Sequence, residues 1–298
     1  MQNGPPDQRV LDERLEVAAR CGSQLGEGPV WVAAEQALYW VDIAAPRIWR
    51  MVWPDGTTAH WTPPFRVSAL APARTGGFIA ATDQGFARID PAAGGYRLIG
   101  KPCQEPAGNR FNDGKVDPDG RFWTGSMDDA EAAETGALYR LGADGSWTTA
   151  GTGYRIPNGP AFAGRVMYLA DSALRTIYRF ALGGDGVPGT RDLFRRFGPS
   201  DGHPDGMTVD AEGCLWVAFW DGWAVRRFSA GGEDIDRLDL PVQRPTSCAF
   251  GGPALDRLYI TSARKGLDAA ALHAQPLAGA LLMATPAIGG PALPCYAG

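Results

Sequence analysis

The sequence repeats one short pattern six times, and this repeat limits the folds that the chain can adopt. In each copy an apolar strand precedes a second strand rich in aromatic or bulky residues, such as Leu38-Tyr39-Trp40-Val41-Asp42 or Arg121-Phe122-Trp123-Thr124-Gly125. The second strands are centred on residues 40, 79, 123, 168, 216 and 259, which gives a period of about 45 residues. Short strands at a fixed period of this length are typical of the blades of a β-propeller.

A third strand that carries an arginine follows in five of the six units, as in Thr176-Ile177-Tyr178-Arg179-Phe180. A β-sandwich gives no reason for a fixed period, and a TIM barrel needs helices, of which only Asp268 to Ala274 is a fair candidate. The sequence therefore predicts an all-β six-bladed propeller. We expect one domain over residues 1–298, with residues 1–13 as a flexible N-terminal extension and residues 14–19 as an outer strand of the last blade.

Composition and charge exclude several classes of function. The chain has 28 basic and 33 acidic residues and shows no basic run, so a nucleic-acid partner is not expected. It shows neither a signal peptide nor an apolar segment long enough to cross a membrane, and its five cysteines form no CxxC pair. We expect a cytoplasmic protein that is a monomer or a weak homo-oligomer, without nucleic-acid or membrane partners.

Polar residues followed by glycine recur where four of the blades begin. The pairs are Glu27-Gly28, Asp113-Gly114 after Asn112, Asn158-Gly159 and Asp205-Gly206. Each pair taken alone reads as a hairpin turn. At one phase of the repeat, however, the side chains would converge at one mouth of the channel, and carboxylate and amide oxygens suit a divalent cation. The three histidines have no metal-binding spacing, so a metal would depend mainly on oxygen ligands.

At these residues the sequence resembles the SMP-30/gluconolactonase/regucalcin-like family of six-bladed propeller lactonases. The stretches that carry the resemblance are Gly26 to Trp31, Arg110 to Asp117, Gly120 to Met127, Asn158 to Pro160, Pro204 to Met207 and Leu215 to Ala218. The resemblance implies Glu27, Asn158 and Asp205 as metal ligands, with Arg110 and Asn112 as substrate-binding residues. It also implies an acidic substrate contact shortly after Met127. Asp128, Asp129 and Glu131 all qualify for that contact, and the role of His203 stays open.

The implied activity is metal-dependent hydrolysis of a sugar aldonolactone, of the gluconolactone or xylonolactone type, to the aldonic acid. The metal would polarise the lactone carbonyl and activate water, with Asp205 as both ligand and general base. Ca²⁺, Zn²⁺, Mg²⁺, Mn²⁺ and Fe²⁺ are all compatible with such ligands. A non-catalytic calcium-binding regulatory propeller and a different metal-dependent esterase are the alternatives. Asp117-Pro118-Asp119-Gly120 is expected to be a solvated turn, because the full calcium-loop pattern is absent.

Overall fold

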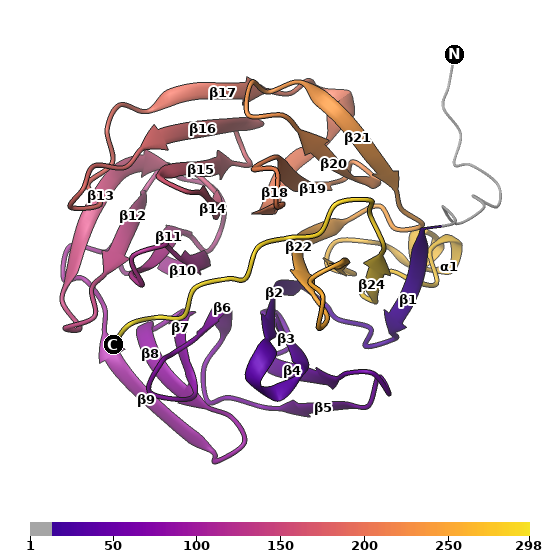
Figure 1. Ribbon diagram of the computed structural model, residues 1–298, viewed down its shortest axis with the longest axis horizontal. Coiled ribbons are helices and arrows are strands. Elements are labelled where there is room, and N and C mark those ends of the chain that lie inside the picture. The colour runs from indigo at the N-terminus through magenta and orange to yellow at the C-terminus, as the bar shows by residue number, and fades with distance from the viewer. Residues whose placement is uncertain (1–13) are drawn as a thin grey trace.

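The structure is a computed structural model and describes residues 14–298. Its strands form six four-stranded antiparallel sheets arranged as a ring (Figure 1). The predicted six-bladed β-propeller is therefore confirmed. The N-terminal extension predicted for residues 1–13 lies outside the described residues.

Each blade runs from an innermost strand at the channel to an outermost strand at the rim. The innermost strands are β2 (Gly26–Val32), β6 (Val67–Pro72), β10 (Asn109–Val116), β14 (Pro157–Ala163), β18 (His203–Val209) and β22 (Pro245–Gly251). The second strands are β3 (Ala37–Asp42), β7 (Phe78–Thr82), β11 (Phe122–Asp128), β15 (Val166–Asp171), β19 (Leu215–Trp220) and β23 (Arg257–Ser262). These second strands contain the six aromatic-rich copies that define the sequence repeat.

The third and fourth strands complete the blades. The third strands are β4 (Arg47–Val52), β8 (Gly85–Asp90), β12 (Gly136–Leu141), β16 (Thr176–Ala181), β20 (Ala224–Phe228) and β24 (Leu281–Ala284). The fourth strands are β5 (Thr58–Trp61), β9 (Gly95–Gly100), β13 (Trp147–Tyr154), β17 (Asp192–Arg196), β21 (Asp234–Asp239) and β1 (Leu15–Ala19). Two short 3₁₀ turns, Ala33–Glu35 and Pro199–Asp201, lie in connections.

The ring is closed by pairing the first described strand with the last one. Strand β1 pairs with β24 in antiparallel register, with Leu15 opposite Ala284, so the N-terminal side of the chain supplies the outer strand of the last blade. This closure and the predicted helix are both confirmed. The helix is α1 (Ala269–Ala274), and Asp268 caps it by accepting a hydrogen bond of 2.8 Å from the amide of Ala271.

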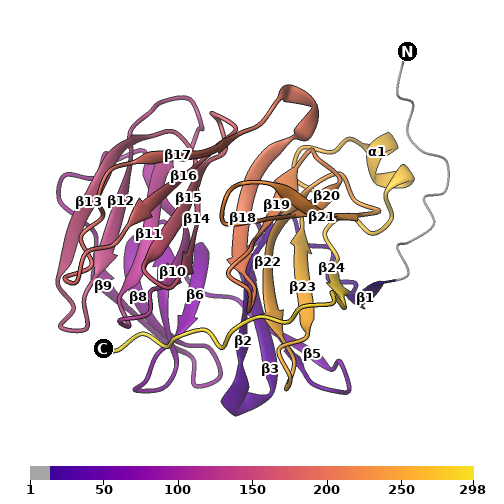
Figure 2. The same ribbon diagram turned by 45° about the horizontal axis from the view of Figure 1, so that its top comes forward.

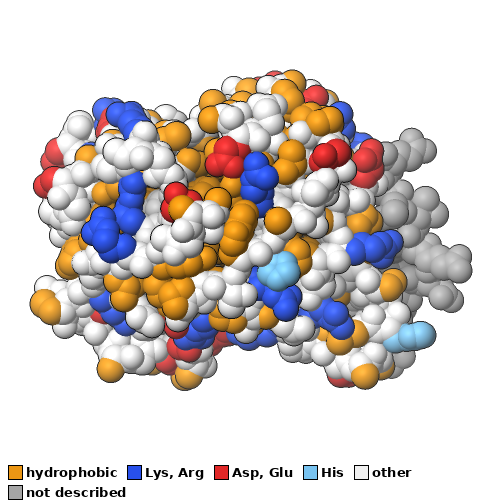
Figure 3. Space-filling view, turned by 90° about the horizontal axis from the view of Figure 1, so that it is seen from below, with side chains coloured by type: hydrophobic (Ala, Val, Ile, Leu, Met, Phe, Trp, Pro, Cys, Tyr) orange, Lys and Arg blue, Asp and Glu red, His pale blue; other side chains and the backbone are white. Residues whose placement is uncertain are grey.

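Apolar side chains fill the spaces between neighbouring blades. Trp40, Trp123 and Trp216 of the second strands are buried there, with at most 1% of their surface exposed. The second strand of each blade buries a large aromatic side chain, and this explains why the period of the sequence follows these residues. The side of the ring seen in Figure 3 shows acidic and basic side chains scattered among neutral ones.

The segment after β24 crosses the ring at one end of its channel (Figures 1 and 2). Its backbone bonds to the end of one innermost strand and to the turns that follow two others. Tyr296 N donates to Pro72 O of β6 at 2.8 Å, Gly289 O accepts from Ala211 N at 2.9 Å, and Ala297 N donates to Gly120 O at 2.9 Å. The other end of the channel, where the innermost strands begin, is left for the site described next. No helix in residues 14–298 is long and apolar enough to span a membrane.

Candidate active site

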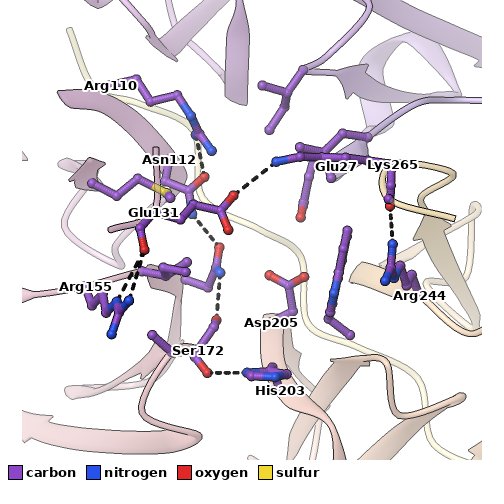
Figure 4. A pocket seen from close by; sticks show the side chains of 18 residues that line it. Glu27, Arg110, Asn112, Glu131, Arg155, Ser172, His203, Asp205, Arg244 and Lys265 are labelled. Atoms are coloured by element: carbon purple, nitrogen blue, oxygen red, sulfur yellow. Dashed lines mark hydrogen bonds and ion pairs between the residues drawn. The ribbon is translucent and has the colours of Figure 1, made fainter. Parts of the chain in front are cut away.

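A cavity of about 530 Å³ lies where the innermost strands begin (Figure 4). All five residues singled out from the sequence line it: Glu27 from β2, Arg110 and Asn112 from β10, Asn158 from β14 and Asp205 from β18. The structure thus brings together side chains from four blades that are up to 178 positions apart in the chain. Their roles in metal and substrate binding stay predictions.

Bulges in the innermost strands coincide with these side chains. The register of each innermost strand shifts once against its neighbour, and the shifts in four blades fall beside the site residues: between Glu27 and Val30, Phe111 and Gly114, Asn158 and Ala161, and Pro204 and Met207. A bulge bends the strand and re-aims the side chain next to it. The sequence pattern of a polar residue followed by glycine therefore marks bulges at the channel.

Glycine is required at two of these bulges for different reasons. Gly159 has a φ of 81°, a conformation that most residues with a side chain avoid. At Gly206 a Cβ atom would lie 2.2 Å from Ser247 Oγ of the next blade. The glycines therefore let the backbone turn and approach its neighbour while the preceding side chain faces the cavity.

Blades two and six have the same bulge but present hydroxyl groups there. The Ser68 hydroxyl donates to Asn112 O at 2.8 Å, and the Thr246 hydroxyl donates to Gly26 O. These two side chains bond to the backbone of a neighbouring innermost strand. They therefore support the strands that carry the site residues.

Two carboxylates face one another inside the cavity, those of Glu27 and Asp205 (Figure 4). Only 6% of Glu27 and 7% of Asp205 is exposed. Burial raises the pKa of both groups well above the ordinary value, and repulsion from Asp205 and Asp113 raises the pKa of Glu27 further. Burial also raises the pKa of Asp113 to about 6. A cation between the carboxylates would oppose these shifts, because a neighbouring positive charge favours the ionised form of a carboxyl group.

A chain of amides and hydroxyls fixes the neutral side of the cavity. Asn112 Nδ2 donates to Asn158 Oδ1 at 2.8 Å, and Asn158 Nδ2 donates to the Ser172 hydroxyl at 2.8 Å. The Ser172 hydroxyl in turn donates to Pro204 O at 2.6 Å. A carbonyl oxygen has two lone pairs, so Asn158 Oδ1 can accept from Asn112 and still ligate a cation.

Arg110 is buried behind Asn112 and is held on two sides. Its Nη1 donates to Asn112 Oδ1 at 2.7 Å, and its Nε lies 2.8 Å from a carboxylate oxygen of Asp129. Its Nη2 has no hydrogen-bond partner among the described residues. Arg110 therefore orients the amide of Asn112 and retains its Nη2 amino group as a donor for a ligand.

The residues present fit a hard or borderline divalent cation. Glu27, Asn158 and Asp205 offer two carboxylates and one amide oxygen, and the two carboxylates have no cationic side chain as an ion-pair partner within residues 14–298. No cluster of three or more His, Cys, Asp and Glu side chains in that part of the chain has the arrangement of a metal site. A cation here would therefore need the Asn158 amide, with water completing its coordination.

The acidic residues after Met127 have three different surroundings. Asp128 accepts backbone bonds from Ala130, Ala132 and Ala133 and stays on the surface, whereas Asp129 pairs with Arg110 and Arg66. Glu131 lines the cavity, and its carboxylate lies 3.0 Å from Lys265 Nζ. Of the three candidates, the geometry favours Glu131.

His203 lies at the mouth of the cavity, and each of its ring nitrogens is within hydrogen-bond distance of a polar atom. Nδ1 lies 2.8 Å from Ser172 O, and Nε2 lies 3.1 Å from Arg175 Nη2. This pattern suits the tautomer with hydrogen on Nδ1, since an arginine can only donate. His203 therefore supports the mouth of the cavity between two neighbouring segments.

The sequence reasoning missed three cationic side chains that line the cavity, Arg155, Arg244 and Lys265, and the hydroxyl of Ser172. Each comes from a connection between strands and not from the start of an innermost strand. Lys265 bonds to a carboxylate 134 positions away in the chain, so no local pattern could have placed it there.

Residues 25–264 match the sequence model of a family described as SMP-30/gluconolactonase/LRE-like region. The chain belongs to this family. The resemblance inferred from its motifs is therefore confirmed, and the family match covers all five of the predicted site residues.

Relatives in this family include named lactonases and regucalcins. The chain is 38% identical over 294 residues to the 6-deoxy-6-sulfogluconolactonase of Pseudomonas putida, covering 97% of this chain and 100% of the relative. It is 39% identical over 251 residues to the pentonolactonase XacC of Haloferax volcanii, covering 80% and 82% of the two chains. It also superposes on the regucalcin of Agrobacterium tumefaciens, described as a calcium-binding protein, with a TM-score of 0.90 at 31% identity over 94% of this chain and 96% of that one.

Proposed function

We propose that this protein is a sugar lactonase that hydrolyses an aldonolactone to the aldonic acid and uses one divalent cation held by Glu27, Asn158 and Asp205. The observation that carries the proposal is the pair of buried carboxylates facing one another in an open cavity, beside an arginine and two amides. The names of two relatives, a sulfogluconolactonase and a pentonolactonase, support a sugar lactone as the substrate.

The protein residues divide the work of hydrolysis. When bound, a divalent cation would polarise the lactone carbonyl and lower the pKa of a water molecule. Asp205 would accept a proton from the attacking water as a general base, and Arg110 with Asn112 would hold the substrate oxygens. Water adds to the carbonyl carbon, the bond from that carbon to the ring oxygen breaks, and the ring oxygen takes up a proton. The product is an open-chain hydroxy acid.

A non-catalytic calcium-binding role is the second candidate. It is favoured by the similarity to the Agrobacterium tumefaciens regucalcin, which is described as a calcium-binding protein. The identity of the cation among Ca²⁺, Zn²⁺, Mg²⁺, Mn²⁺ and Fe²⁺ stays open. The cytoplasmic location and the monomeric or weakly oligomeric state stay predictions from the sequence.

The test is acid release from a panel of five- and six-carbon sugar lactones, before and after treatment with a chelator and with each metal added back. Glu27→Gln should lose bound metal and hydrolysis together. Glu16→Gln, on the exposed face of β1, is the matched control and should retain both. Full activity after complete metal removal would contradict the metal-dependent mechanism. Stoichiometric calcium binding without hydrolysis of any lactone would favour the second candidate.

A further inference from the structure

Four cationic side chains line the cavity, and three of them are paired with a carboxylate. The pairs are Arg110–Asp129 at 2.8 Å, Arg244–Asp221 at 2.7 Å and Lys265–Glu131 at 3.0 Å between nitrogen and oxygen. Arg155 is the fourth, and within residues 14–298 no carboxylate lies within ion-pair distance of its guanidinium group. Arg155 is therefore the cavity's one unbalanced cation in the described part of the chain.

Arg155 is held in place by backbone groups. Its Nε and Nη2 both donate to Glu131 O, at 3.3 Å each (Figure 4). The backbone amide of Arg155 donates to the carboxylate of Asp171, at 2.9 Å from Oδ2. Its Nη1 has no hydrogen-bond partner among the described residues. The guanidinium group is thus fixed along one edge and retains donors and a full charge for a ligand.

The charge of the cavity follows from these contacts. A divalent cation would balance Glu27 and Asp205, and the three ion pairs are neutral, which leaves the positive charge of Arg155. Arg155 lies in the bend before β14 and is half-buried, whereas Asn158, three residues later on β14, is only 5% exposed. The unbalanced charge therefore lies on the outer side of the proposed metal ligands.

We propose that Arg155 binds an anionic substituent at the end of the lactone remote from its carbonyl group, so that the preferred substrate is an acidic sugar lactone. This inference rests on the proposed lactonase function and specifies its substrate class. A sulfonate, a phosphate or a carboxylate would each form charge-assisted hydrogen bonds with the guanidinium group. A neutral sugar lactone would leave this charge without a partner.

The experiment compares lactones that differ only at carbon six, using the full chain loaded with metal. Glucono-1,5-lactone is the neutral substrate, and its 6-phosphate and 6-deoxy-6-sulfo analogues are the anionic ones. A lactone with a carboxylate at carbon six shows whether the smaller anion suffices. The parent protein should favour at least one anionic lactone by about tenfold or more in kcat/KM.

Variants of Arg155 separate its charge from its contact with the backbone. Arg155→Gln should raise KM for the anionic lactone about tenfold and leave the neutral lactone within about twofold. Arg155→Lys retains the charge and should keep part of the preference. Arg165→Gln is the matched control, because Arg165 lies at the opposite end of the same hairpin and also donates to a backbone carbonyl, Gly183 O at 3.0 Å. It should behave as the parent.

Several outcomes would overturn the inference. If Arg155→Gln slows both lactones equally, Arg155 only positions the segment around Glu131. If the parent hydrolyses the neutral lactone as well as every anionic one, the inference fails while the lactonase function stands. If no lactone is hydrolysed, the proposed function fails, and calorimetric binding of gluconate and 6-phosphogluconate decides the inference. Binding of the phosphorylated acid that is lost in Arg155→Gln would uphold the anion site, and equal or absent binding would reject it.

Discussion

Two groups of buried carboxylates in this propeller have opposite surroundings. Asp117 and Asp210 lie in the turns after β10 and β18 and are at most 2% exposed. Glu27 and Asp205 lie at the other end of the channel and are buried almost as deeply. The two groups are buried to a similar extent, but they differ in the number of hydrogen-bond donors around each carboxylate.

The carboxylates in the turns are fully bonded, in the same way in two blades. Asp117 accepts from Trp123 Nε1 at 2.8 Å, from Arg121 Nε at 2.7 Å and from two backbone amides. Asp210 accepts from Trp216 Nε1 at 2.9 Å, from Arg227 Nε at 2.7 Å and from two backbone amides. Each therefore ties a turn, an indole and an arginine together.

The carboxylates at the cavity have one backbone donor each, from Gly28 and from Gly206, and they face like charges. Such a group is costly for the folded state because burial removes water from it and no cationic side chain of residues 14–298 forms an ion pair with it. A protein that retains it leaves a place for a ligand. The comparison therefore predicts that removing one kind of carboxylate costs activity and removing the other costs stability.

The largest effect is expected at Asp205. Asp205→Asn should reduce lactone hydrolysis by roughly 10³-fold, because it removes both a metal ligand and the general base. In the presence of a chelator its melting temperature should equal or exceed that of the parent, since a repelled buried charge is gone. Steady-state kinetics and thermal unfolding check both halves. Asp55→Asn, in an exposed turn, is the control, and a strongly destabilised Asp205→Asn would contradict the comparison.

Asp117→Asn should give the reverse result. The substitution removes the charge of a fully buried carboxylate from its ion pair with Arg121, which then keeps only the exposed Asp119 as a charged partner. Breaking a buried pair typically costs about 3–5 kcal/mol of unfolding free energy. Hydrolysis by the protein that remains folded should stay near the parent rate. Urea unfolding measures the loss, and Asp119→Asn, on the same turn but exposed, should lose far less. Equal losses for the two variants would show that the turn carboxylate is not a structural tie.

The pH dependence of the metal-free protein should distinguish the two groups as well. The pKa values of Glu27, Asp113 and Asp205 are raised in the folded state, so the folded protein binds protons more tightly there than the unfolded chain. Their contribution to stability is then greatest at low pH, and for Asp113 it is lost as the pH rises from about 4 to about 6. The pKa values of Glu27 and Asp205 are raised well above the ordinary value of a carboxyl group, so the loss of stability continues as the pH rises further.

The measurement is thermal unfolding in chelator at pH 5 and pH 8. The melting temperature of Asp205→Asn should exceed that of the parent by roughly 2 °C or more at pH 8, and by much less at pH 5. Added metal should remove the difference in pH dependence, because the cation replaces the protons. If this difference in melting temperature became smaller as the pH rises, the conclusion that the carboxyl pKa values are raised in the folded state would be wrong.

The sequence was sufficient for the ring and for the residues that face its channel. The blades follow from a local pattern, because each buries a large apolar or aromatic residue, such as Ile79 or Trp123, at the same position of its second strand. The polar residues at the bulges were found because the same bulge recurs at one phase of the repeat. Neither inference needed contacts between blades.

Contacts between distant segments were not accessible in this way. Lys265 of the last blade and Arg155 of the blade next to that of Glu131 both contact Glu131, and these contacts follow from how the ring places the blades beside one another. The expectation of a solvated turn at residues 117–120 holds for the exposed Pro118 and Asp119 but is wrong for Asp117, because Trp123 and Arg121 fold over its carboxylate and leave it 0% exposed. An aspartate followed by a glycine turn and a tryptophan six residues later is the signal that identifies this tie.

The smallest effect is expected at Asp268, an exposed carboxylate that tests whether burial matters in addition to the number of hydrogen-bond donors. Its carboxylate accepts one backbone hydrogen bond, from Ala271, which is as many as Glu27 accepts from Gly28. Asp268 lies on the surface, so water satisfies its remaining oxygen atoms, and Asp268→Ala should cost only about 1 kcal/mol through loss of the N-cap of α1. Asp268→Asn retains the acceptor and should be neutral in urea unfolding. Hydrolysis should be unchanged in both variants. A loss of several kcal/mol, or a loss of bound metal, would mean that a single donor marks a functional carboxylate whether or not water reaches it.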